Sequence, residues 1–283
     1  MSETTGAWSG GAFGERARCV LAPNADVMTL DGTNTWVLRE PGARRSVVID
    51  PGPQIAAHLD AVAERAGEVA VVLLTHGHAD HSEAARSFAE RMGCGVRALD
   101  PAHRLGAEGL ADGDVVEVDG LEVRVVGTPG HTSDSLSFLL PAEHAVLTGD
   151  TVLGRGTTVV AHPDGQLGAY LDSLQRLHRL AEDREVAAVW PGHGPVIDDA
   201  LAVLDHYLRH RAQRLEQVRE ALRVLEREAG GPGDGTSPSR DEAGVAPDLA
   251  RAVVERVYAD VDPVLWGAAE LSVRAQIDHL RSA

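Results

Sequence analysis

Short apolar runs alternate with helix-like segments along the chain as far as residue 192. The apolar runs are rich in β-branched residues and bounded by turn residues, which predicts strands. They fall at 33–38, 45–50, 69–75, 95–99, 114–128, 135–140, 144–150 and 186–192. Between them, apolar positions at helical spacing predict helices over 54–66, 82–92 and 167–181. This order of elements predicts an α/β (α+β) fold in which helices cover two sheets.

From Asp198 onward the pattern is that of one long helix. Leucine and valine recur three, four or seven residues apart, at 201, 204, 208, 215, 218, 222 and 225, which marks one face of a helix. The segment 230–247 is rich in Gly, Pro and Ser and predicts a flexible loop, after which two more helical segments follow. We therefore expect a larger domain over 1–195 and a small helical domain over 196–283.

The composition limits the class of protein. A chain of 283 residues can form one large domain and a smaller partner. Its two cysteines, Cys19 and Cys94, are far apart, which excludes a disulfide framework and a thiolate zinc site. No apolar run approaches the roughly 18 residues that span a bilayer, and the first residues lack the apolar stretch of a signal peptide. We expect a cytoplasmic protein that does not bind a membrane.

The charged residues exclude some chemistries. The formal net charge is -17, and all 26 basic residues are arginine. The absence of lysine excludes lysine-based mechanisms, including that of the serine β-lactamases with an SxxK motif. The negative charge also argues against a broad basic face for nucleic acid.

The stretch THGHADH, directly after an apolar run, concentrates titratable side chains at one turn. His76 and His78 are two residues apart, so in a loop both imidazoles can converge on one point. Asp80 and His81 follow at the expected start of a helix and can point to a neighbouring position. The motif is suggestive of metal binding.

Three further groups each follow a strand-like run. They are His131 in GTPGHTSDS, Asp150 in LTGD and His193 in WPGHGPVI. Because strand-end loops on one rim of a sheet bring distant residues together, we expect all seven side chains to lie close to one another. Imidazole and carboxylate ligands without thiolate suit zinc, manganese or iron. One tetrahedral site needs only three or four ligands, so seven indicate two metals.

These motifs, in this order, resemble the metallo-β-lactamase superfamily, from Cys19 to about Ile197. The resemblance implies an αββα sandwich with the metals at one edge and a catalytic domain over 1–195. It implies that the first metal is held by His76, His78 and His131. It implies that the second is held by Asp80, His81 and His193, with Asp150 bridging the two. The antibiotic-hydrolysing zinc enzymes of the superfamily commonly use a cysteine at the position of Asp150, so a β-lactam substrate is not expected.

The expected cofactor is a pair of divalent ions, with zinc favoured over manganese or iron. Such an ion lowers the pKa of bound water from 15.7 to about 7, which makes hydroxide available for hydrolysis at a carbonyl or phosphoryl centre. Asp80 is the expected catalytic carboxylate, since it can orient the nucleophile. Asp50, in VVIDPG, is either a turn residue or the partner of a ligand histidine. The residues expected near the substrate are Thr33, Asn34, Arg155 and His162.

The segments DGTNTWVL, PGHGPVI and HYLRHRAQRLEQV resemble a two-domain β-lactamase-like subgroup with a C-terminal winged-helix-like domain. This subgroup includes single-strand endoribonucleases, and related proteins are thioesterases that release polyketides from carrier proteins. The chain stops at AQIDHLRSA, where a β-wing is expected to continue, so we expect a truncated, helical version. The missing wing and the negative charge favour an ester or thioester, either small or bound to a carrier protein.

Other functions stay open at this point. RNA cleavage remains an alternative through an arginine groove formed by Arg209, Arg211, Arg214 and Arg219. THGHADH also resembles the mononuclear iron sulfur dioxygenases, whose facial triad corresponds to His76, His131 and Asp150, although the intact His193 favours two metals. A binding module without activity is a third alternative. Surface or packing roles are expected for His58, His103, His144, His162, His178, His206, His210 and His279.

Overall fold

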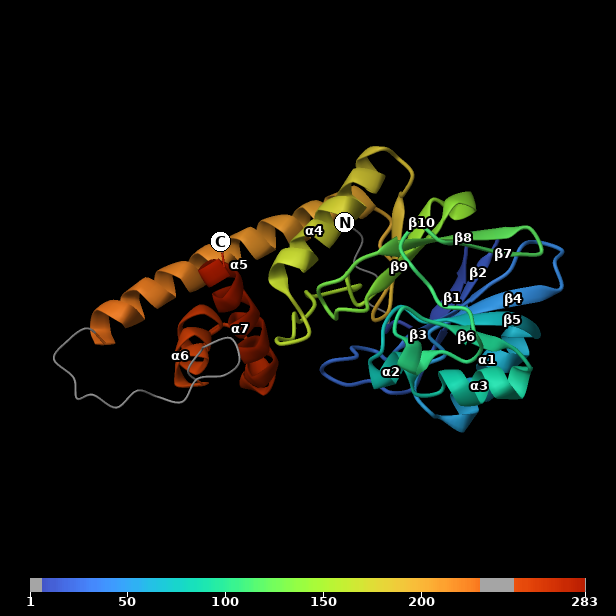
Figure 1. Cartoon of the computed structure of the whole chain (residues 1–283), viewed down its shortest axis with the longest axis horizontal. Helices are drawn as coiled ribbons and strands as arrows, with labels where there is room; N and C mark the ends of the chain where they lie inside the picture. Colours follow the sequence, from blue (N-terminus) through green and yellow to red (C-terminus); the bar gives the residue numbers. More distant parts are fainter. Residues whose placement is uncertain (1–6, 230–246, 283) are drawn as a thin grey trace.

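Two mixed sheets face each other and carry helices on their outer faces (Figure 1). The computed structural model describes residues 7–229 and 247–282. The first sheet runs, in spatial order, β1 (Gly10–Phe13), β2 (Ala17–Leu21), β3 (Asn34–Leu38), β4 (Arg45–Ile49), β5 (Glu68–Leu73) and β6 (Gly95–Arg97). The second runs β11 (Ala188–Pro191), β10 (Ala145–Gly149), β9 (Leu136–Leu140), β8 (Leu121–Gly127) and β7 (Val115–Val118). The predicted αββα sandwich is confirmed.

Apolar side chains from both sheets form the central core. All residues of β3, β9 and β10 are buried, because these strands lie inside their sheets and are covered on both faces. Trp36 and Trp190, one from each sheet, stack with ring centroids 5.1 Å apart. This contact joins the middle of β3 to the end of β11, next to the loop that carries His193.

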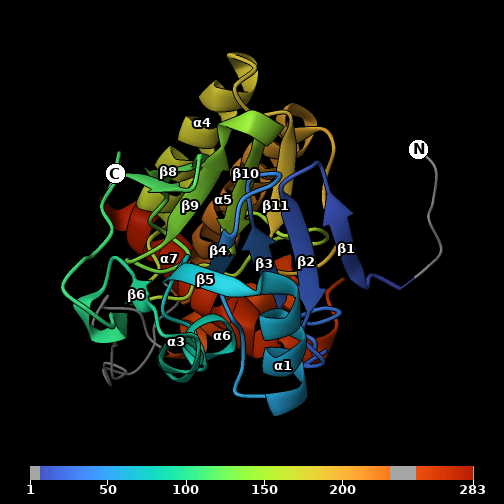
Figure 2. The same cartoon turned by 90° about the vertical axis from the view of Figure 1, so that its right-hand side faces the viewer.

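Helices pack on the outer faces of the two sheets, as the view in Figure 2 also shows. α1 (Ala56–Ala66) and α3 (Ala85–Met92) cover the first sheet, where Val48 and Val72 pack against Leu59 and Phe88. α4 (Leu167–Glu182) and the first part of α5 (Ala200–Ala229) cover the second sheet, with Leu204 in a shared apolar cluster. Alternate strand residues point to opposite faces, which supplies both the central core and the helix contacts.

The described residues from 200 onward form helices and contain no strand. The second part of α5 packs against α6 (Pro247–Val257) and α7 (Trp266–Ser282) around Val218, Val253 and Ile277. The expected C-terminal helical segment is therefore confirmed, whereas its likeness to a winged helix stays a prediction. α5 contributes to both this cluster and the sandwich, and the boundary near residue 195 also stays a prediction. Of the loop predicted at 230–247, residues 230–246 lie outside the described residues and Pro247 begins α6.

The strands predicted from the apolar runs are present, with two differences in the elements. Strands β1 and β2 precede the first predicted strand. The helix predicted over 82–92 begins earlier, as the short α2 (Ala79–Ser82), and continues as the separate α3. The apolar run at 114–128 forms the hairpin β7–β8 around Asp119 and Gly120, which agrees with the turn that an Asp-Gly pair between alternating apolar residues predicts. Among the described helices, none combines the length and apolar character that a bilayer span requires.

Candidate metal centre

The candidate ligands lie on loops at one edge of the sandwich. His76 and His78 follow β5, and His131 follows β8. Asp150 comes directly after β10, and His193 follows the neighbouring parallel strand β11. Parallel strands end at the same edge of a sheet, so the last two loops are brought together by the strand pairing itself. All seven side chains predicted from the sequence fall into two adjacent groups.

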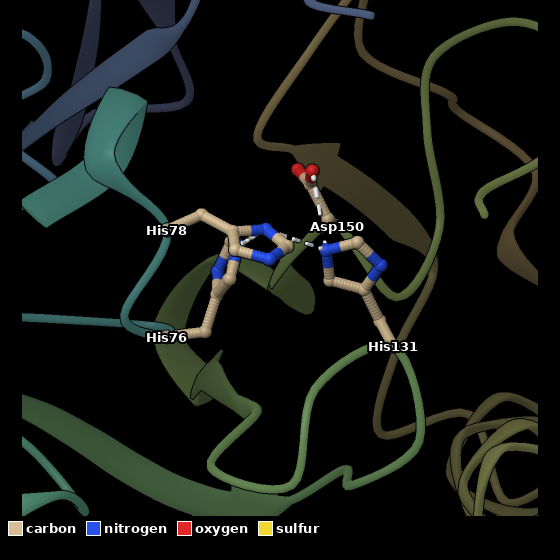
Figure 3. Close-up of side chains that lie close together, drawn as sticks. All are labelled: His76, His78, His131 and Asp150. Atoms are coloured by element: carbon tan, nitrogen blue, oxygen red, sulfur yellow. Dashed lines mark hydrogen bonds and ion pairs between the residues drawn. The ribbon is translucent and has the colours of Figure 1, made fainter. Parts of the chain in front are cut away.

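The first group consists of His76, His78, His131 and Asp150, whose side chains point toward one another from three loops (Figure 3). His78 Nδ1 lies 3.0 Å from His76 Nε2 and 3.1 Å from His131 Nε2. Two nitrogens bound to one tetrahedral zinc at about 2.0–2.1 Å would lie about 3.3 Å apart. The spacing of these nitrogens therefore fits a single metal ion between them.

The second group consists of Asp80, His81 and His193. The Nε2 atoms of His81 and His193 are 3.2 Å apart, and Asp80 Oδ2 lies 3.1 Å from His193 Nε2. This spacing also fits one ion. The group is buried except for Asp80, whose side chain is 28% exposed. Asp80 is thus the member of this group that solvent can reach.

Asp150 stands between the two groups. Its Oδ1 lies 3.4 Å from Nε2 of both His81 and His193, whereas its Oδ2 lies 3.7 Å from His131 Nε2. Oδ1 is buried and has no hydrogen-bond partner among the described residues. A buried carboxylate oxygen without a partner is costly unless a cation or proton compensates it. The position of Asp150 therefore fits a ligand that bridges two ions.

Partners of the ring Nδ1 atoms fix which nitrogen faces the centre. His81 Nδ1 donates to Asp50 Oδ2 at 2.9 Å, and His131 Nδ1 donates to the carbonyl oxygen of Val159 at 2.7 Å. His193 Nδ1 likewise faces the carbonyl oxygen of Gly32 at 3.1 Å. A carboxylate or carbonyl oxygen can only accept, so each Nδ1 carries a proton, and in the neutral form of each imidazole Nε2 presents a lone pair to a metal.

The Nδ1 atom of His76 also carries a proton, because two successive hydrogen bonds through Thr75 connect it to Asp50. The Thr75 hydroxyl donates to Asp50 Oδ2 at 2.6 Å and therefore accepts from His76 Nδ1 at 3.0 Å. Asp50 also accepts from the backbone N–H of Thr75 at 2.8 Å. Of the two roles considered for Asp50, contact with a ligand histidine is the one that the geometry shows. Such partners orient ligands and tune their basicity.

The two groups of candidate ligands differ in the direction in which their surroundings shift the pKa values of the histidines. Burial alone would lower the pKa of His193, but the carboxylates of Asp150 and Asp80 raise it to about 9. Burial opposes ionisation of Asp80, yet the neighbouring charges of His81 and His193 lower its pKa to about 2. By contrast, burial lowers the pKa of His76 well below its ordinary value. Without metal, the second group is an ion-paired cluster and His76 in the first is neutral.

The residues expected near the substrate occupy different positions. The Thr33 hydroxyl lies 3.3 Å from Asp80 Oδ2, so Thr33 contacts the second group. Asn34 is buried and donates from Nδ2 to the carbonyl oxygens of Pro191 and Gly194, on either side of His193, at 2.9 Å each. Arg155 lines the cavity described below, and His162 is not among its lining residues.

A cavity of about 350 Å³ opens beside the first group. Its wall contains His131 and Asp150 on one side and residues of α5 and α7, including Ala269, on the other. The lining is mostly apolar and includes Leu153 and Val159. A concave, largely apolar site with a few polar groups is typical of small-molecule binding. An organic group bound in this cavity would therefore lie next to the candidate metal ligands His131 and Asp150.

The sequence did not predict that α5 forms part of the cavity wall. The hydroxyl of Tyr207 accepts from the backbone N–H of Leu153 at 2.9 Å, which ties the loop after Asp150 to the helix. His210, expected in a surface or packing role, and Arg211 both line the cavity. Of the four arginines considered as an alternative groove for RNA, Arg211 and Arg214 line this cavity, whereas Arg209 and Arg219 are exposed and paired with acidic residues of their own helix.

Comparison with known proteins identifies the family. The profile of the metallo-beta-lactamase superfamily matches residues 28–193. The chain is 36% identical over 253 residues to a protein of Aspergillus fumigatus named atrochrysone carboxyl ACP thioesterase, covering 86% of this chain and 74% of that one. The chain belongs to the metallo-β-lactamase superfamily, and it is a hydrolase of that fold.

Solved structures show the same architecture. A beta-lactamase domain protein from Burkholderia ambifaria superposes with a TM-score of 0.74 at 20% identity, over 99% of this chain and 90% of that one. A protein solved in a di-iron-bound form superposes with a TM-score of 0.51 at 25% identity, over 65% of this chain and 96% of that one. The first comparison covers the C-terminal helices as well as the sandwich.

Proposed function

We propose that this protein is a dinuclear metal-dependent hydrolase that cleaves a thioester and that both of its metal ions are zinc. The observation that carries the proposal is the position of Asp150. Its two oxygens face two separate groups of ligands, and the same residue lines an apolar cavity large enough for an acyl group. The likeness to a relative named as a carrier-protein thioesterase supports a thioester rather than another carbonyl compound.

The proposed ligands follow the two groups. His76, His78 and His131 would hold one ion, Asp80, His81 and His193 would hold the other, and Asp150 would contact both. When bound, two divalent ions activate water and polarise the substrate carbonyl. Nitrogen and carboxylate ligands of this kind bind zinc, manganese or iron, and the ligand types alone do not separate these metals.

The protein's own residues contribute orientation and proton handling. Asp80 stays ionised because its pKa is lowered to about 2, so it can accept a hydrogen bond from attacking water. Thr33 lies against Asp80 Oδ2 and limits its rotation. The apolar cavity walls exclude bulk water from the acyl group, which strengthens electrostatic interactions at the carbonyl. Water then replaces the thiol, and the products are a carboxylic acid and a free thiol.

Two alternatives are less well supported. RNA cleavage would use the same ligands, but Arg209 and Arg219 are paired with acidic side chains rather than free for phosphates. A mononuclear iron dioxygenase would bind its metal through His76, His131 and Asp150. The second group, Asp80, His81 and His193, would then hold no metal. Their Nε2 and carboxylate atoms converge as closely as those of the first group, which favours two ions. A cytoplasmic location stays a prediction.

The test is a matched set of substrates. Metal-replete protein is incubated with acyl thioesters of pantetheine, with the same acyl groups on a carrier protein, and with single-stranded RNA. We expect thiol release from the thioesters, no cleavage of RNA, and loss of turnover in His78→Ala. His144→Ala, which changes a histidine outside both groups, is the matched control and should keep full activity. RNA cleavage without thiol release would overturn the proposal.

A further inference from the structure

Arg211 is a buried cation in the wall of the cavity. It lies in the middle of α5 and is only 5% exposed. One guanidinium nitrogen donates to the carbonyl oxygen of Thr158 at 2.5 Å, and the group lies 4.9 Å from the ring of Tyr170. Within residues 7–229 and 247–282, it forms no ion pair, and its Nε atom is buried without a hydrogen-bond partner.

Further basic groups lie beside it. His210 Nδ1 is also buried and has no hydrogen-bond partner among the described residues, and His210 lines the same cavity. Arg214, one turn further along α5, also lines the cavity. Its Nη2 lies 3.7 Å from Oδ2 of Asp260, whose side chain is 74% exposed. Burial and the positive charges of Arg211 and Arg214 lower the pKa of His210 to about 4. Arg211 therefore adds to this part of the cavity wall a positive charge that no carboxylate of the described residues pairs with.

Such an arrangement is costly for the protein alone. Arginine stays protonated in proteins, and buried charges are normally paired with a counter-charge. The remaining lining of the cavity is apolar and includes Leu153, Val159 and Leu265. A ligand that compensates Arg211 must therefore combine an apolar body with an anionic oxygen.

We propose that this cavity is a subsite for an acidic acyl group, one that carries an ionised oxygen remote from the scissile thioester. The inference rests on the proposed function. The thioester carbonyl lies at the His131 and Asp150 end of the cavity, the carbon chain lies against the apolar wall, and the anionic oxygen accepts from the guanidinium of Arg211 and lies beside His210. Charge-assisted hydrogen bonds of this kind are about twice as strong as neutral ones.

The test compares two acyl groups of equal carbon number. Hexanoyl and adipoyl thioesters of N-acetylcysteamine differ in a terminal carboxylate, and their kcat/KM values are measured with metal-replete protein. We expect adipoyl to be preferred by at least about tenfold, in line with the strength of a hydrogen bond to a charged group. Arg211→Met should reduce this ratio to about 1 while hexanoyl turnover persists. Arg219→Met removes the same charge from an exposed position of α5 and should leave the ratio unchanged.

A structural role for Arg211 would give a different result. Arg211 also supports the loop that contains Val159, the hydrogen-bond partner of His131. If Arg211→Met lowers the turnover of both thioesters equally, or if the wild-type protein hydrolyses both equally, the subsite proposal is wrong. Metal content and melting temperature of the variant are measured alongside to separate a folding defect from a change in preference.

A binding measurement separates this proposal from the proposed function. If no thioester is hydrolysed, the proposed function fails, and calorimetry with monomethyl adipate and methyl hexanoate still tests the subsite on the metal-replete protein. Tighter binding of monomethyl adipate that is lost in Arg211→Met would support the subsite. An advantage that persists in Arg211→Met would place the carboxylate elsewhere and overturn it.

Discussion

Asp50 controls the candidate metal centre without belonging to either group of ligands. It follows β4 with a φ of 49°, in the left-handed region, which turns its side chain toward Thr75 and His81. Three hydrogen bonds converge on its two oxygens. Through them, one carboxylate sets the protonated nitrogen of His81 directly and that of His76 through the Thr75 hydroxyl. This single residue therefore links the two groups.

We expect Asp50→Asn to weaken metal binding without unfolding the protein. An asparagine amide that donates toward His81 Nδ1 would favour protonation of Nε2, which cannot then bind a metal. Loss of such a partner typically costs about 10–100-fold in metal affinity. Competition with a metal chelator measures the change. Asp60→Asn, at an exposed position paired with Arg91, is the control, and equal affinity in both variants would contradict the assigned role.

Metal binding should release protons at neutral pH. In the metal-free protein the carboxylates of Asp150 and Asp80 raise the pKa of His193 to about 9, so His193 is protonated at pH 7. The pKa of His81 is also raised above its usual value by neighbouring carboxylates. Ligation requires neutral imidazole, so bound protons compete with the metal. The apparent affinity should therefore rise as pH increases toward about 9. Calorimetry at pH 7 in two buffers of different ionisation enthalpy measures the released protons, and a value of zero would exclude these protonation states.

The candidate ligands could be predicted from the sequence because their chemistry is written in residue type and order. THGHADH, His131, Asp150 and His193 each follow a strand-like run, and the structure places all of them together. Their hydrogen-bond partners could not be predicted in the same way. Two of them, on Gly32 and Val159, are backbone carbonyl oxygens, which every residue type has. Only the path of the chain brings these atoms to the imidazoles.

At the scale of the element, α5 joins the sandwich to the C-terminal helices. Positions 204, 211, 218 and 225 are seven residues apart on one helix face, and all are apolar except Arg211. A charged residue at a position of the apolar stripe was the available signal for a second functional region. This signal is ambiguous in the sequence, because an arginine-rich helix also fits a solvent-exposed surface. The contacts of Arg211 with Thr158 and Tyr170 resolve this ambiguity.

We expect Tyr207→Phe to destabilise the protein and loosen the cavity wall. The Tyr207 hydroxyl accepts from Leu153 and donates to the carbonyl oxygen of Gly156 at 3.2 Å. Its removal leaves the Leu153 N–H without this partner, at a cost of about 1–3 kcal/mol in the free energy of unfolding. Denaturant titration measures this loss, and KM should rise while metal content stays the same. The neighbouring His206→Ala, which lies outside the cavity lining, should change neither quantity.

The strands β1 and β2 show a limit of pattern recognition. β1 contains two glycines in four residues, and β2 has only five residues. Neither length nor composition separates such segments from a loop. Pairing within the sheet decides their conformation, since β2 lies antiparallel to β3 along its whole length and β1 pairs with β2. Phe13 of β1 then packs against Trp36, with ring centroids 5.5 Å apart.

At the scale of the whole molecule, the cavity depends on segments that are far apart in the sequence. The loop with Met28, the loop after Asp150, and helices α5 and α7 all contribute to its wall. The helical pattern of α5 was evident in the sequence, whereas its packing against the second sheet was not. The C-terminal helices therefore form part of the proposed substrate site rather than a separate appendage.

The net charge of -17 and the local arginines act at different distances. A charge of this sign repels a polyanion along the whole approach, although salt screens the effect beyond about 8 Å at physiological ionic strength. Arg211 and Arg214 act only on a group that has entered the cavity. The combination favours a small acidic acyl group over a nucleic acid. Overall charge therefore limits the class of partner, and the cavity selects within it.

The most direct test of a two-metal thioester hydrolase is thiol release during metal titration. Zinc is added stepwise to metal-free protein in the presence of an acyl thioester of pantetheine, and the initial rate is followed. We expect little turnover until the first site is filled and a maximum at about two ions per chain, the number that the two ligand groups would hold. No thiol release at two equivalents of zinc, or full activity with a single iron and consumption of oxygen, would contradict the account.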